Sequence, residues 1–478
     1  SGRHPIVIAM TAAVMSKDEE ACRDAGMDDF MPKPLQFEVL QRTMARWAMQ
    51  VPATLQHPAT LLEETPLQAG AMQDARILAV IASPSPDGVA RAVLAVAHPT
   101  VEARMAFPGG RDLPGVAGAM EGVSLMNIEK RGDWEVADGG FQNRRLTAGT
   151  LCRVGSDGTQ AAGLVGVTGG CATPWGSLLL TEGDAAAWRA RLPGVDAGTT
   201  GMVVELDPTN PLWVPSKRAA LGRFAPADAA AALSADGRAV VWLTDGRPGG
   251  HLYRFVSDEA AGMQALDAGR MAAARIEGGS LRWLPLPEGD PLAGARSVGA
   301  SGFDRPWGLA FDAARGRLCV ALRGGAGRVL ELRAAAGDAA AETGVAETLI
   351  DGIAVAMPDP RAAPAPVPAW PWAPAALGFD RDGAVLLGTD RGATPGPLPE
   401  ALYRVPVEGP GRGRAALVLA APVGAALGGA LPAPDGTLLA AIAHPGATPG
   451  ASWAQPATRW PNMRPDEPPR STVVTLAR

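Results

Sequence analysis

The feature that most constrains the fold of this chain is a recurring unit: an apolar run, a turn containing Asp-Gly or Arg-Gly, and a second apolar run. Asp-Gly supplies the positive φ angles that tight hairpin turns need. The turn glycines lie at 237, 316, 383 and 436, at intervals of 79, 67 and 53 residues, which indicates a blade repeat lengthened by insertions. The units are AAALSADGRAVVWLTDG (230–246), GLAFDAARGRLCVAL (308–322), AALGFDRDGAVLLGTD (375–390) and GALPAPDGTLLAAIAHPG (429–446).

These repeats predict a mainly β chain, and a β-propeller in particular, because radial blades hide the strand edges of a long all-β chain. A pair of β-sandwiches is the alternative. Glycine (59) and proline (44) make up about a fifth of the 478 residues, which argues against a helical bundle. We expect two interruptions of the β body: a loop insert at 333–348 and an extended, proline-rich surface insert at 356–374.

Charge and cysteine content exclude several classes of protein. The net charge of −6 leaves no basic surplus for nucleic acid or an anionic membrane. Cysteines 22, 152, 171 and 319 have no paired spacing, which argues against a zinc ribbon or a disulfide framework. No apolar run approaches the ~20 residues of a membrane-spanning helix. No charged and then apolar leader is visible, so we expect a cytoplasmic chain.

The first 48 residues follow a different pattern from the rest. An apolar run at 6–10 predicts a buried strand, and Ser16 and Gly26 are suitable caps for a helix over 16–25. A second strand around 28–31 and a helix over 36–48 follow. The β-α-β-α order is typical of a parallel α/β sheet. We therefore predict an α/β domain at 1–48, a linker at 49–75 and a β domain at 76–478.

The N-terminal segment resembles the C-terminal half of a response-regulator receiver domain, through PIVIAMTA and ACRDAGMDDFMPKP. The resemblance implies that Thr11 and Lys33 are the residues that sense a phosphoryl group. The half with the acidic Mg²⁺ pocket and the phosphoacceptor is not seen, so we expect a half-receiver that cannot itself be phosphorylated. A phosphorelay protein with a kinase partner and a propeller output domain is one alternative, and a truncated or chimeric gene model is another.

Several phrases of the β body occur together over about 76–478. They are HPTVEARMAFPGG (98–110), RGDWEVADGGFQNRRLTAGT (131–150), GGCATPWGSLLLTEGD (169–184), VVELDPTNP (203–211), SKRAALGRF (216–224), GGHLYRFVSDE (249–259), FDRPWGLAFD (303–312), GFDRDGAVLLGTD (378–390) and AHPG…TRWPN…RSTVVTL (443–476). Through these phrases, which follow the order of the family, the β body resembles the PhoX family of alkaline phosphatases, which are normally exported. This resemblance implies a β-propeller that hydrolyses phosphomonoesters with iron and calcium ions on its axis.

At most ligand positions that the resemblance implies, this chain carries other residues. Glutamate is replaced at Pro99, Ala227 and Trp307, the cysteine at Thr168 and an aspartate at Ala375, whereas one glutamate survives as Glu182. Clustered cations repel one another unless anionic ligands offset their charge. We therefore expect a degenerate metal site and a pseudoenzyme with little or no phosphomonoesterase activity. The alternative is a phosphomonoesterase with a rearranged site around Glu182, Asp184 and Cys171.

A few residues remain as candidates for binding. Glu182 and Asp184 are the candidate metal ligands, with calcium as the ion, and a solvated acidic turn is the alternative. Lys217, Arg218 and Arg223 are candidates for binding an anion such as a phosphomonoester, and ion-paired surface charge is the alternative. We expect no cofactor, or calcium and iron if the family site persists. We expect structural roles for His98, Cys171, Asp245 and His251, and space-filling roles near the axis for Trp175 and Trp307.

Overall fold

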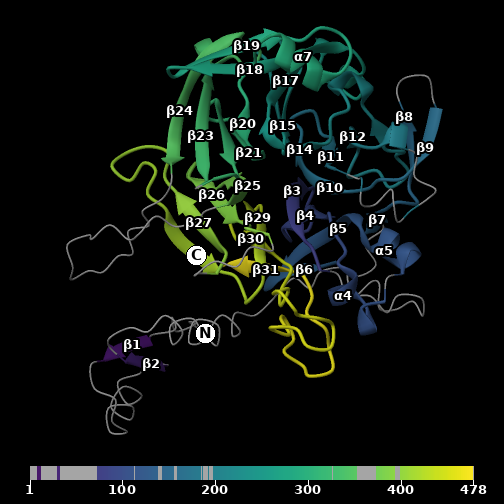
Figure 1. Ribbon diagram of the computed structural model, residues 1–478, viewed down its shortest axis with the longest axis vertical. Helices are drawn as coiled ribbons and strands as arrows, with labels where there is room; N and C mark the ends of the chain where they lie inside the picture. Colours follow the sequence, from purple (N-terminus) through teal and green to yellow (C-terminus); the bar gives the residue numbers. More distant parts are fainter. Residues whose placement is uncertain are drawn as a thin grey trace.

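A computed structural model describes residues 8–11, 29–32, 73–111, 113–137, 143–154, 159–184, 186, 192, 197–325, 327–351, 373–392 and 399–476. In these ranges strands dominate, and they form blades around a common axis (Figure 1). None of the described helices is long and apolar enough to cross a membrane.

The first three blades follow the chain, with β8 and β9 extending the outer edge of blade 2. Blade 1 contains β3 (Arg76–Ser83), β4 (Arg91–His98), β5 (Gly122–Arg131), β6 (Asp133–Val136) and β7 (Arg144–Leu146). Blade 2 contains β10 (Val167–Ala172), β11 (Leu178–Glu182), β12 (Val203–Leu206), β13 (Ser216–Lys217), β8 (Leu151–Val154) and β9 (Thr159–Ala162). Blade 3 contains β14 (Pro226–Leu233), β15 (Arg238–Asp245), β17 (Leu252–Ala260), β18 (Gly269–Glu277) and β19 (Ser280–Pro285).

The last three blades are simpler, and β19 pairs with β24 to join blades 3 and 4. Blade 4 contains β21 (Pro306–Asp312), β22 (Arg317–Leu322), β23 (Arg328–Ala334) and β24 (Thr343–Asp351). Blade 5 contains β25 (Pro374–Phe379), β26 (Val385–Thr389), β27 (Ala401–Val405) and β28 (Ala416–Ala420), and blade 6 contains β29 (Ala426–Pro432), β30 (Leu438–Ala443) and β31 (Thr472–Leu476). Shorter elements are β16 (Pro248–Gly250), β20 (Phe303–Asp304), α4 (Ala103–Ala106), α5 (Pro114–Met120), α7 (Pro291–Ser297), η1 (Pro108–Gly110), η2 (Ala197–Thr199), η3 (Ala219–Leu221), η4 (Ala265–Asp267) and η5 (Ala335–Gly337).

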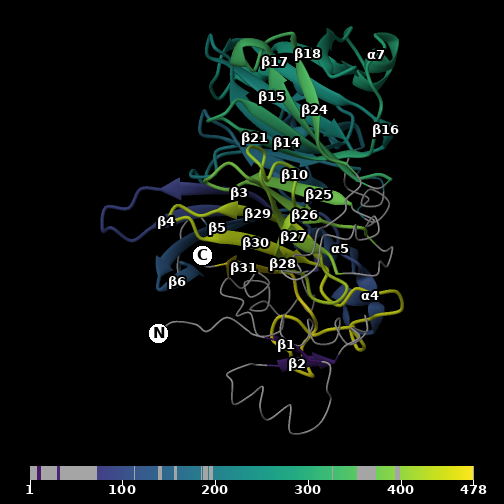
Figure 2. The same cartoon turned by 90° about the vertical axis from the view of Figure 1, so that its left-hand side faces the viewer.

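The innermost strands of the six described blades close a ring. β3, β10, β14, β21, β25 and β29 each pack against the next, and β29 packs against β3. Figure 2 shows β29 and β30 beside β3 on one side and blade 5 on the other. This ring confirms the predicted propeller architecture rather than a pair of sandwiches.

The four predicted turns are the inner hairpins of blades 3 to 6. Gly237, Gly316, Gly383 and Gly436 have φ values of 83°, 61°, 83° and 91° and lie between the first and second strands of their blades. The repeat that the sequence indicates is therefore the blade, and the unequal intervals reflect insertions outside these hairpins.

The apolar core is divided among the blade interfaces. In β15, Val240 and Trp242 pack toward blade 4, whereas Val241 and Leu243 pack toward blade 2. Because both faces of such a strand are buried against neighbouring blades, its sequence is a continuous apolar run rather than an alternating one. The short apolar runs in the sequence therefore indicate strands that are packed between two neighbouring blades.

Hydrogen bonds hold the ring closed where the start of blade 1 meets blade 6. Gln73 Nε2 donates to the carbonyl oxygen of Pro469 at 2.8 Å, and the His444 backbone N–H donates to the Gln73 carbonyl at 2.6 Å. Residues 73–75, assigned to the linker from the sequence, are buried against blade 6.

One β prediction is wrong. The segment 333–348 is not a loop insert, because it contains the start of β24, which pairs with β23 from Gly344 to Asp351. Its alanines suggested an insert without an apolar face, but Ala346 is buried, as are Leu349 and Ile350 farther along β24.

The N-terminal prediction is only partly described. β1 (Ile8–Thr11) pairs in parallel with β2 (Asp29–Pro32), as a β-α-β unit requires, and Thr11 ends β1. Lys33, the helices predicted at 16–25 and 36–48, and residues 356–372 of the surface insert lie outside the described residues. The half-receiver stays a prediction.

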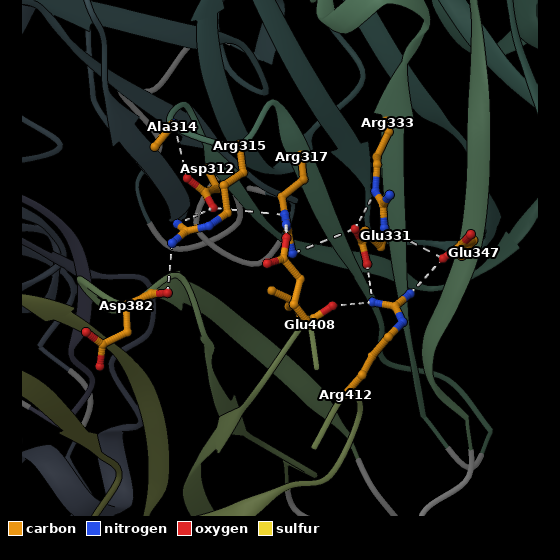
Figure 3. Close-up of polar contacts among 11 residues, drawn as sticks. Asp312, Ala314, Arg315, Arg317, Glu331, Arg333, Glu347, Asp382, Glu408 and Arg412 are labelled. Atoms are coloured by element: carbon orange, nitrogen blue, oxygen red, sulfur yellow. Dashed lines mark hydrogen bonds and ion pairs between the residues drawn. The ribbon is translucent and has the colours of Figure 1, made fainter. Parts of the chain in front are cut away.

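An ion-pair network joins blades 4 and 5 around Glu331 of β23 (Figure 3). Arg333 Nε donates to Glu331 Oε1 at 2.7 Å, and Arg412, from the segment after β27, donates to Glu331 Oε2. Arg317, which is 3% exposed, donates to Glu408. Burial raises the pKa of Glu331, but the hydrogen bonds from Arg333 and Arg412 outweigh it, so its pKa lies below the ordinary value.

We predict that Glu331→Gln lowers the free energy of unfolding by about 1.5–3 kcal/mol at pH 7, since charge-assisted hydrogen bonds are lost. A carboxylate whose pKa is lower in the folded than in the unfolded state stabilises the fold above its unfolded-state pKa, about 4.3. This contribution to the free energy of unfolding is lost as the pH falls through the folded-state pKa. Urea unfolding at pH 7 and pH 3 measures the difference from wild type, which we expect to shrink at pH 3. Glu277→Gln, whose side chain is 68% exposed and pairs with Arg275 outside this network, is the control. An equal difference in the free energy of unfolding at both pH values would contradict the assignment of this stabilisation to the Glu331 carboxylate.

Candidate functional site

All six described inner strands begin at one rim of the propeller, and each is bulged there. The first residue of each inner strand pairs with the last or next-to-last residue of the second strand, and the register then shifts. We call this end the bulged rim. β-Bulges redirect side chains and are frequent beside active sites. The shifts lie between Ile77 and Ala79, Val167 and Gly169, Pro226 and Asp228, Pro306 and Leu309, Pro374 and Ala376, and Leu427 and Ala430.

Four of the replaced ligand positions lie in these bulges. They are Thr168 of β10, Ala227 of β14, Trp307 of β21 and Ala375 of β25. The Thr168 hydroxyl donates to the Ala227 carbonyl oxygen at 2.9 Å, so it fastens blade 2 to blade 3. Alanine and tryptophan side chains offer no oxygen or thiolate to a cation. The fold thus places these four positions at one rim, but the side chains there have structural roles rather than the chemistry of metal ligands.

An ion pair stands across the axis at the bulged rim. Arg76 Nη2 of blade 1 donates to Asp228 Oδ2 of blade 3 at 2.8 Å and to the Ala375 carbonyl oxygen of blade 5 at 3.2 Å. Asp228 also accepts the backbone N–H of Gly170 (blade 2) at 2.9 Å and of Leu309 (blade 4) at 3.0 Å. A single buried pair therefore ties together five blades. Burial raises the pKa of Asp228, with Arg76 opposing it.

Other carboxylates near the bulged rim also have cationic or imidazole partners. Glu182 pairs with Lys217 at 2.8 Å, Asp245 with Arg247 at 2.7 Å and Asp390 with Arg323 at 2.9 Å. Asp74 Oδ1 lies 3.3 Å from His444 Nε2, and Thr100 Oγ1 donates to Asp74 Oδ2 at 2.8 Å. Burial raises the pKa of Asp74, and His444 opposes this effect.

The two predicted metal ligands have different surroundings. Glu182 is fully buried, and its carboxylate accepts Lys217 Nζ and the backbone N–H groups of Val165 and Met202. Asp184 is exposed, and its Oδ1 accepts the Ala186 N–H at 2.9 Å. The structure thus directs one carboxylate to a buried lysine and leaves the other at the surface.

The predicted anion-binding residues do not form one site. Lys217 is fully buried with Glu182 and also donates to the Thr199 carbonyl oxygen at 2.6 Å. Arg218 donates to Glu205 at 2.8 Å and to Asp267 at 2.5 Å, whereas Arg223 is exposed. Lys217 and Arg218 therefore have carboxylate partners inside blade 2 and its neighbour.

Trp307 fills the rim between blades 3 and 4, as expected from the sequence. Its ring packs over Gly246, where an added Cβ would lie 2.7 Å from the indole, and Arg323 lies 4.8 Å from the ring centroid. Trp175 lies in the β10–β11 turn, at the opposite end of its strand from the bulge, and donates to Glu205 at 2.9 Å. Its space-filling role is within the blade 2 and blade 3 core.

The remaining sequence candidates lie in well-packed surroundings. His98 Nδ1 donates to the Asp74 carbonyl oxygen at 2.8 Å, and Nε2 accepts the Ser124 hydroxyl at 2.8 Å. His251 Nδ1 donates to the Ser301 carbonyl oxygen at 2.9 Å. Burial raises the pKa of the Cys171 thiol, so it is not a ready thiolate.

Sequence reasoning missed Arg76, Asp228, Asp74 and His444 as members of the rim. A usable signal existed for two of them, because Arg76 and Asp228 are charged residues inside otherwise apolar strands, RILAVIAS and PADAAAAL. Buried charges are rarely unpaired. That rule predicts a partner for each of them, although it does not say which.

Comparison with known proteins decides the family. The model of the alkaline phosphatase PhoX family matches residues 32–446. The chain belongs to the PhoX alkaline phosphatase family. The match begins inside the segment assigned to a half-receiver, and it covers the whole ring of inner strands.

A solved PhoX structure shares the fold of this chain. Pseudomonas fluorescens PhoX in complex with vanadate, a transition state analogue, matches with a TM-score of 0.71 and 24% identity, over 85% of this chain and 89% of that one. A putative oxidoreductase (glucose dehydrogenase) from Thermus thermophilus is a weaker match, with a TM-score of 0.35 and 16% identity, over 86% of this chain and 98% of that one. No curated protein matched the chain.

The residues at the PhoX rim do not fit the iron and calcium cluster that the family resemblance implies. Within the described ranges, no three His, Cys, Asp or Glu side chains are arranged to hold a metal ion. Hard cations need several oxygen ligands. Here Glu182 and Asp228 each accept a protein cation and two or three backbone N–H groups. The donor set of this rim is that of an ion-paired protein interior.

Proposed function

We propose that this PhoX-family propeller is a metal-independent binding protein without a working phosphomonoesterase centre. The observation that best supports the proposal is the Arg76–Asp228 ion pair, which lies in the middle of the bulged rim. Both oxygens of the Asp228 carboxylate accept hydrogen bonds there. The bulge positions Thr168, Ala227, Trp307 and Ala375 supply no further anionic group.

The electrostatics support this proposal. A multivalent cation at Glu182 or Asp228 would have to displace Lys217 or Arg76, both of which are charged and largely buried. Leaving a displaced cation buried and unpaired costs several kcal/mol. Neighbouring cations would in addition repel one another without the missing carboxylates.

Elemental analysis together with p-nitrophenyl phosphate turnover tests the proposal on the full chain. We expect no stoichiometric iron or calcium after purification in the presence of both ions, turnover no faster than blank, and a melting temperature that a chelator does not change. Pseudomonas fluorescens PhoX is the positive control for the assay. Stoichiometric metal with turnover that a chelator abolishes would overturn the proposal. Asp184→Asn would then report whether the surviving acidic pair holds the ion.

A further inference from the structure

A cavity of about 330 Å³ runs along the propeller axis inside the ring of inner strands. It extends from Arg76 and Asp228 at the bulged rim to Val80, Phe379 and Pro432 at the other. Its volume lies at the lower end of the range for small-molecule sites. Among the described residues that line it, Arg76 and Asp228 are the charged ones.

Arg76 presents unused donors to this cavity. The hydrogen bonds of its guanidinium to described residues come from Nη2, to Asp228 and to Ala375. Nε and Nη1 have no hydrogen-bond partner among the described residues, and Arg76 is one of the residues that line the cavity. Asp228 is already satisfied by Arg76 and by the N–H groups of Gly170, Ala229 and Leu309. Arg76 is therefore the group at this end that still needs an acceptor.

The walls of the cavity are the free edges of strands. Each inner strand is the terminal strand of its blade or sheet, so one edge of its backbone has no strand partner. At the bulged rim, side chains satisfy part of this edge, as Asp228 does for Leu309 N–H. Farther along, the lining residues are mainly Ala, Gly, Leu, Val and Phe, which offer no polar side chain. Backbone donors and acceptors there are open to a ligand.

We propose that the axial cavity binds a linear polyhydroxylated monocarboxylate, with its carboxylate at Arg76 and its hydroxyls along the strand edges; this rests on the binding role proposed above. Hydroxyls both donate and accept, as the strand edges require. The four residue steps from Arg76 to Val80 span roughly 13 Å. A six-carbon chain, whose contour is below about 8 Å, fits this length. The carboxylate takes the charge-assisted donors of Arg76.

Isothermal titration calorimetry with three matched six-carbon probes tests the proposal on the full chain. Gluconate has both the carboxylate and the hydroxyls, sorbitol has only hydroxyls, and hexanoate has only the carboxylate. We expect gluconate to bind about tenfold or more tightly than either of the others, because each lacks one set of hydrogen bonds. No binding of gluconate would mean that water alone occupies the cavity, and it would overturn the proposal. So would equal or tighter binding of sorbitol or of hexanoate.

Variants locate the binding. Arg76→Gln is expected to reduce gluconate binding to the level of sorbitol. Because Arg76 also stabilises the fold, a second variant, Ala172→Trp, blocks the cavity at its other rim, where Ala172 is exposed at the end of β10. We expect it to abolish gluconate binding, whereas Ala235→Trp, in an exposed turn outside the cavity lining, binds as the wild type does. Binding that survives Ala172→Trp would overturn the axial assignment.

The failure of this proposal is distinguishable from the failure of the proposed function. Gluconate binding that a chelator abolishes, in a chain with stoichiometric metal, contradicts the metal-independent role. A metal-free chain without turnover that binds none of the three probes contradicts only the ligand class.

Discussion

Asp228→Ala is expected to destabilise the propeller by about 3–5 kcal/mol, because it leaves a buried charge without its partner. Arg76 is 11% exposed and would lose the carboxylate with which it pairs, and the N–H groups of Gly170 and Leu309 would lose their acceptor. Urea or thermal unfolding followed by circular dichroism measures the loss. Asp258→Ala, on an exposed position of β17, is the control, with an expected change within about 0.5 kcal/mol.

A double variant separates the ion pair from the packing around it. Arg76→Met combined with Asp228→Ala removes both charges, so we expect it to be less destabilised than Asp228→Ala alone. Additive losses would show that Asp228 stabilises the fold through its backbone contacts and not through Arg76.

Lys217→Met is expected to destabilise the chain by a similar amount, about 3–5 kcal/mol at pH 7, since it leaves Glu182 buried and unpaired. Burial already raises the pKa of Glu182, and Lys217 is the main group that opposes this. Without Lys217 the folded state binds a proton more tightly than the unfolded state, so stability falls as pH rises. The destabilisation measured by urea unfolding should therefore be smaller at pH 5 than at pH 8.

Two further variants check this interpretation. Lys217→Met with Glu182→Gln should recover part of the loss and remove its pH dependence. Lys130→Met, whose side chain is 27% exposed and lies 3.6 Å from Asp435, is the matched control with a small expected effect. A pH-independent loss in Lys217→Met would mean that Glu182 is neutral in the native chain.

Together, the two buried pairs describe how the carboxylates of the bulged rim are neutralised in this family member. Glu182 and Asp228 are the kind of buried oxygen ligands that a cation requires, but lysine and arginine occupy their coordination. A protein cation carries one charge and is fixed to the chain. The rim can therefore form without any ion, and the axial cavity behind it remains open.

Local sequence predicted the repeating part of the fold well. The glycines at 237, 316, 383 and 436 lie in the predicted hairpins, because a tight turn with positive φ depends on a few adjacent residues. The resemblance likewise pointed to the bulge positions Thr168, Ala227, Trp307 and Ala375, whose clustering the structure reveals. The segment 343–351 was missed, because its strand is defined by pairing with β23 rather than by its own composition.

The charges of the rim could not be paired from sequence. Arg76 and Asp228 are 152 residues apart, and Lys217 and Glu182 are 35 apart. The sequence by itself determined that the inner hairpins of blades 3 to 6 form and that most ligand positions implied by the family resemblance carry other residues, since both depend on local residue identity. Only the tertiary structure decided which carboxylate meets which cation, because closing six blades into a ring brings distant strands to one axis, where burial makes every unpaired charge costly.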